Sequence, residues 1–212
     1  MPGPPNRPPE KTPETPLPPV VPESPQQKSL RRLAPSRVAL LLDPWKGAPH
    51  PDLMVPFDKA EAAYQAGDYS AALSALDQLS VRFAEPRWPT LPEPFRLLRV
   101  SIPAPMPPHW DPSHGLSPAE KEAIRAGRVA HEQLTLAGAC VAWAAAHQVA
   151  TEDLARPIEE ARTLLDTEGV TAGFYDRIDA VWSAVLERVP RPKNTAVRAP
   201  APRAAAVEAE DA

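Results

Sequence analysis

The distribution of proline limits what this chain can fold into more than any other feature of its sequence. The 212 residues include 31 prolines, and only Pro157 lies between Ala119 and Val189. Because proline lacks an amide hydrogen and clashes with the preceding helical turn, long helices are expected where proline is scarce. Eleven prolines fall within the first 25 residues and ten within 86–118. The pattern predicts an all-α protein whose helices are flanked and connected by proline-rich segments.

These boundaries predict the organisation of the chain. Residues 1–28 hold few large apolar side chains, so they are expected to form a disordered proline-rich arm. Residues 29–190 should form one helical domain, followed by a disordered tail at 191–212. The expected parts of the domain are a helical hairpin at 57–84, a proline-rich strap at 85–117 and an antiparallel three-helix block at 118–190.

Composition excludes several classes of protein. The net charge is −4, and residues 119–190 carry 7 basic and 12 acidic side chains, which argues against a nucleic-acid-binding surface. Cys140 is the only cysteine, so an intramolecular disulfide cannot form. The first residues lack the apolar stretch of a signal peptide, and the apolar centre of Gln133–His147 is too short to span a bilayer. We therefore predict a cytoplasmic protein that binds neither nucleic acid nor membrane.

A short apolar run follows the arm. Val38–Leu42 should form one buried element, and periodicity alone does not distinguish a strand from a helix. Lys28, Arg31, Arg32 and Arg37 lie beside it. Since small charged clusters are usually solvated, we interpret these four side chains as surface residues.

The strap combines proline with bulky side chains. It contains Trp88 and Trp110, which are rare in free linkers, so we expect it to lie extended against the helices. The segment Phe95–Ile102 could form a strand that pairs with Val38–Leu42.

The sequence at 57–84 indicates two helices joined by a tight turn. The first, over about 57–66, should end at Gly67, because glycine adopts the left-handed conformation that closes a helix. Asp68 is expected to cap the start of the second helix. Apolar residues at three-to-four spacing on that second helix predict one buried face.

The stretch Tyr64–Leu73 resembles the turn and second helix of a tetratricopeptide repeat. Tyr69 and Ala72 stand where that family has an aromatic residue and a small residue that allows close helix packing. The large aromatic residue expected early in the first helix is absent, and Pro86 closes the unit a turn late. No second copy follows at a period of 34 residues. The resemblance implies a helical-repeat-like fold and a role in protein binding.

The block at 118–190 opens with a clear helix start. Ser117 as N-cap, Pro118 at the first position and Glu120 at the third form a capping box, so a helix should run to about His147. Residues 134–146 are almost entirely apolar, which predicts a central helix buried on all sides.

Two further helices should follow. One starts at Thr151 or Arg156 and ends at Gly169, and the other covers about 173–189 with Trp182 on its buried face.

The strap also holds the best candidate site for chemistry. His109, Asp111 and His114 place two imidazoles and a carboxylate within six residues, and these are donors that zinc accepts. The alternative is a surface loop in which Asp111 begins an Asp-Pro turn. The sequence contains no phosphate loop, dinucleotide fingerprint or other cofactor motif, so no cofactor is predicted.

We therefore predict a non-catalytic protein–protein interaction or scaffold module. Its partner would be another protein, bound in a helical groove lined by the small-residue faces of the hairpins. One alternative is a small metal-dependent enzyme or metal-binding protein that uses the His109–His114 loop. Another is a structural subunit of an oligomer or larger assembly.

The metal-binding hypothesis predicts that purified protein carries a stoichiometric transition metal. Elemental analysis measures this directly. Protein free of stoichiometric metal would exclude a site built from His109, Asp111 and His114.

Overall fold

The protein is all-α. The computed structural model describes residues 23–42, 49–99 and 115–193, and these residues form six α-helices and one short 3-10 helix, with no strand among them. The α-helices are α1 (Pro25–Ala39), α2 (Pro51–Gln65), α3 (Tyr69–Ala84), α4 (Pro118–Ala146), α5 (Ala155–Glu168) and α6 (Ala172–Arg188), and the 3-10 helix is η2 (Phe95–Leu98).

Proline and a polar cap begin three of these helices. At α1 the Ser24 hydroxyl accepts from the amide of Gln27, whose side chain accepts from the Ser24 amide in return. The predicted capping box of α4 is confirmed: the amide of Ser117 donates to the Glu120 carboxylate over 2.6 Å. Each pair satisfies amides that lack partners at a helix start. The helix α2 also begins with proline, after an N-cap at His50.

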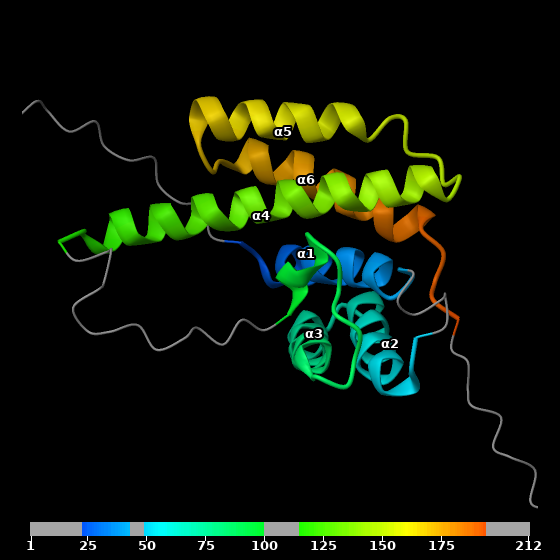
Figure 1. Cartoon of the computed structure of the whole chain (residues 1–212). Helices are drawn as coiled ribbons and strands as arrows, with labels where there is room; N and C mark the ends of the chain where they lie inside the picture. The colour runs from blue at the N-terminus through cyan, green and yellow to red at the C-terminus, as the bar shows by residue number, and fades with distance from the viewer. Residues whose placement is uncertain (1–22, 43–48, 100–114, 194–212) are drawn as a thin grey trace, which may run out of the picture.

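The predicted hairpin is confirmed, although its first helix begins at Pro51 rather than near residue 57. Gly67 adopts a φ of 77°, and the Asp68 carboxylate accepts from the amide of Ala71 at the start of α3. The helices α2 and α3 then pack side by side (Figure 1).

The helix α1 lies between two groups of helices. Figure 1 shows α2 and α3 on one side of it and α4 and α6 on the other. The helix contacts all four of them, whereas α5 packs on the far side against α4 and α6. One hydrophobic cluster includes residues from every helix, so the two groups share a core.

This arrangement corrects three expectations and decides one alternative that the sequence left open. The arm boundary at 28 falls inside a helix, because Ser24 and Pro25 start α1. The buried element expected at Val38–Leu42 is helical, since it is the end of α1 and the turn after it. The described part of Phe95–Ile102 is the 3-10 helix η2, and residues 100–102 lie outside the described residues. Residues 1–22 of the arm and 194–212 of the tail also lie outside them.

The third correction concerns α4, which is buried on one face only. Ala130, Leu134, Ala137, Cys140 and Ala144 form a buried stripe. Ala142, Ala145 and Ala146 are exposed. The two other helices of the block, α5 and α6, cover a single side of α4 (Figure 1), so its largely apolar stretch 134–146 is left half open.

The remaining helix starts agree with the sequence. The helix α5 begins at Ala155, so Pro157 lies in its first turn, where the missing amide costs little. Gly169 closes α5 with a φ of 78°. Within the described residues, no helix is both long enough and apolar enough to cross a membrane.

Among the described residues, Trp182 is the largest fully buried side chain, with 0 % of its surface exposed. Its indole Nε1 donates to Gln133 Oε1 on α4 over 3.0 Å. We predict that Trp182→Ala lowers the free energy of unfolding by about 3–5 kcal/mol through the cavity it leaves. Chemical denaturation measures the loss, and a change below about 1 kcal/mol would contradict the core position. Trp182→Phe, which keeps most of the volume, should lose less.

Candidate functional site

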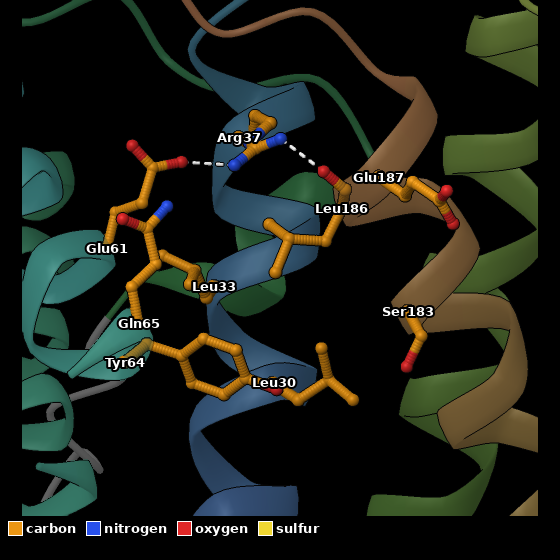
Figure 2. A pocket seen from close by; sticks show the side chains of 9 residues that line it. All are labelled: Leu30, Leu33, Arg37, Glu61, Tyr64, Gln65, Ser183, Leu186 and Glu187. Carbon is orange, nitrogen blue, oxygen red and sulfur yellow. Dashed lines mark hydrogen bonds and ion pairs between the residues drawn. The ribbon is translucent and has the colours of Figure 1, made fainter. Parts of the chain in front are cut away.

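A groove runs between α2 and α6, with α1 as its floor. Figure 2 shows the nine side chains that line its pocket, which has a volume of about 300 Å³. They come from three helices that are far apart in the sequence: Leu30, Leu33 and Arg37 of α1, Glu61, Tyr64 and Gln65 of α2, and Ser183, Leu186 and Glu187 of α6. We call this pocket the α2–α6 groove.

The middle of the α2–α6 groove is apolar. Leu30 and Leu33 are buried at its floor because α1 is covered by helices on both sides. Tyr64 and Leu186 are half-buried and form the two walls. Tyr64 also contacts Tyr69 across the hairpin turn, with ring centroids 5.6 Å apart in an edge-on arrangement. This contact holds the Tyr64 ring in place beside the groove.

A buried ion pair closes one end of the α2–α6 groove. Arg37 is only 8 % exposed and pairs with Glu61, which is 4 % exposed. The same guanidinium donates to the carbonyl oxygens of Leu186 and Val189 (Figure 2 draws the bond to Leu186). These carbonyls belong to the end of α6, where helical acceptors lack partners. Arg37 therefore joins α1, α2 and α6 at one point.

Glu61 has a second basic partner on its outer side. Its other oxygen lies 2.7 Å from Nε of Arg191, which follows α6 and also pairs with Asp58 over 2.8 Å. The chain after α6 is thus fastened to α2. Two positive and two negative groups are in contact here, so their charges balance.

Arg31 attaches the middle of α1 to α6. Its side chain is 3 % exposed and donates two hydrogen bonds to Asp179 of α6, at 2.7 and 3.0 Å. The guanidinium lies 4.1 Å from the ring centre of Tyr175, and Glu23 completes the set at 3.0 Å. Burial, together with the charge of Glu23, raises the pKa of Tyr175 to about 12. Arg31 and Arg37 thus attach α1 to α6 at two places.

These contacts correct the interpretation of the basic cluster as solvated surface. Arg31 and Arg37 are buried and paired with carboxylates, because helices from both sides enclose α1. Arg32 is half-buried and pairs with Asp77 of α3 over 2.7 Å, whereas Lys28 is exposed, as expected.

The rim of the α2–α6 groove is polar and exposed. Gln65 stands on the α2 side, and Ser183 and Glu187 on the α6 side. No side chain of these three makes a hydrogen bond or ion pair with another residue in the part of the chain that the structure describes. Their oxygen atoms therefore face solvent and are free to accept from a bound group.

Two other pockets give fewer grounds for proposing a ligand. A larger groove of about 780 Å³ lies on α2 and α3, with Val55 and Val81 about half exposed, at 51 % and 54 %. Its acids Asp52, Asp77 and Glu85 are already paired with arginines. A third hollow, between α1, α3, η2 and α4, borders Arg99, where the described residues end.

The lining of the α2–α6 groove differs from the small-residue lining that the sequence predicted for a partner groove. The small-residue stripe of α4 packs inside the protein, and leucines and Tyr64 line the α2–α6 groove instead. Sequence reasoning did not identify Arg37, Glu61 or Glu187 as site residues. The one available signal was a glutamate on the mostly apolar α2 and an arginine on α1, each among residues that proved buried.

The sequence predicted a candidate metal site in the strap. The loop of His109, Asp111 and His114 is outside the described residues, so the metal-binding hypothesis stays a prediction. Among the residues that are described, no three His, Cys, Asp or Glu side chains are grouped as metal ligands. Cys140 is fully buried, and this burial raises the pKa of its thiol far above the ordinary value, which opposes formation of a thiolate nucleophile.

Comparison of the chain with protein-family models, with curated proteins and with solved structures finds no match.

Proposed function

We propose that the protein is a non-catalytic interaction module that binds a segment of a partner protein in the α2–α6 groove. The groove itself is the main support: it has an apolar floor and walls, and a polar rim whose side chains bind no other group among the residues that the structure describes. An apolar centre enclosed by a polar rim is the usual arrangement of protein interfaces.

The fixed walls support the same proposal. Arg37 and Arg31 attach α6 to α1, and Glu61 attaches α2 to Arg37. A groove whose walls are already in place loses little conformational entropy when a partner binds. The α2–α3 hairpin adds a second argument, because its resemblance to a tetratricopeptide repeat implies protein binding. That argument rests on analogy with the family alone.

Site-specific photo-crosslinking tests the proposal. We would place p-benzoylphenylalanine at Gln65, on the groove rim, or at Thr163, an exposed residue of α5, which is a helix that does not line the groove. Irradiation of the cells that normally produce the protein should give a discrete protein adduct from position 65 and none from position 163. Mass spectrometry identifies the partner.

The purified partner should then bind the purified full chain. Ser183→Trp places an indole over the groove, so it should weaken binding at least about tenfold, as loss of a central contact does. Thr163→Trp is the matched control and should leave the affinity unchanged. Absence of an adduct at position 65, identical adducts from both positions, or unchanged binding by Ser183→Trp would contradict the proposal.

A further inference from the structure

We infer that the side chain bound in the α2–α6 groove is an arginine of the partner protein, whose aliphatic stem lies on the leucine floor and whose guanidinium meets Glu187 at the rim. This inference rests on the proposed function and adds the chemistry of the partner.

The charges around the groove favour a cation. Arg37 is neutralised by Glu61, and Arg191 by Asp58. The carboxylate of Glu187 has no ion pair among the described residues and stands on the rim beside Leu186 (Figure 2). One negative charge is therefore left at the mouth of the groove, where a bound cation would be only partly solvated and its attraction to Glu187 correspondingly strengthened.

The shape and polarity select a side chain with an apolar stem and several donors. Leu30, Leu33 and Leu186 provide an apolar surface, over which the methylene groups of a long basic side chain can lie. The acceptors stand on both walls, with Gln65 on one side and Ser183 and Glu187 on the other. A guanidinium has five N–H donors in a fixed plane, whereas a lysine ammonium is a point charge with three donors.

The ring of Tyr64 adds a further preference. It is half-buried in the wall, and guanidinium groups stack on aromatic faces. Arg31 already shows this contact in the same molecule, 4.1 Å above Tyr175. The pocket of about 300 Å³ is at the small end for ligand sites, which fits one anchoring side chain better than a whole helix.

Selection from a random peptide library tests this chemistry without knowledge of the partner. Phage-displayed 12-residue peptides would be selected on the full chain, with counter-selection on Ser183→Trp to retain only peptides that need the groove. We expect the selected peptides to share one arginine among apolar residues. Their dissociation constants would be measured by fluorescence anisotropy for the native peptide and for Arg→Ala and Arg→Lys variants.

The decisive readout is a double-mutant cycle between the peptide arginine and Glu187. Glu187→Gln should weaken binding of the native peptide about three- to tenfold but should barely change the affinity for the Arg→Ala peptide. Glu187→Lys should weaken the native peptide further. Glu168→Gln is the matched control: it removes an exposed carboxylate at the end of α5, away from the groove, and should show no coupling.

The outcomes separate the inference from the proposed function. Selected peptides whose arginine is energetically coupled to Glu187 support both the inference and the proposed function. Peptides that need the groove but lack arginine, or whose arginine shows no coupling to Glu187, overturn the inference and leave the interaction function intact. Failure to select any peptide that is sensitive to Ser183→Trp counts against both.

Discussion

The buried guanidinium of Arg37 is the constraint on which the arrangement of α1, α2 and α6 depends. A charge this far from water is tolerated only when it is paired and hydrogen-bonded, and the partners here come from two other helices: Glu61 of α2 and the last carbonyls of α6. Removing one member of a buried pair typically costs about 3–5 kcal/mol, because the other member is left unpaired. The three helices must therefore meet at this point for the core to close.

The groove follows from that constraint. Helices cover α1 on both sides. Arg37 lies between α2 and α6 and holds them apart, so a pocket remains between these two helices above Leu30 (Figure 2). Arg31 repeats the attachment to α6 one to two turns away, through Asp179. Two fixed points on one helix define the direction and spacing of the walls, and a site so arranged needs little rearrangement to accept a partner.

The sequence predicted the local structure far better than the site. Proline spacing, the Ser117–Glu120 capping box and the Gly67–Asp68 turn act within a few residues, so helix starts and the hairpin could be located from sequence alone. The burial of α1 could not, because it depends on tertiary packing against α2, α3, α4 and α6. Arg37 was therefore predicted to be an exposed surface residue, and the apolar run Val38–Leu42 was compatible with both a strand and a helix. The groove residues lie on three helices and share no pattern along the chain.

Replacing the buried pair by apolar residues tests the claim that it sets the groove. The double variant Arg37→Met/Glu61→Leu leaves no unpaired charge on either residue and should stay folded. Spin labels at Gln65 and Glu187, on opposite walls, report the groove width by pulsed electron spin resonance, and buried Cys140 stays unlabelled in the folded protein. The account predicts one narrow distance distribution in the labelled protein with the pair intact and a broadened or shifted one in the double variant. The same narrow distribution in both would contradict it.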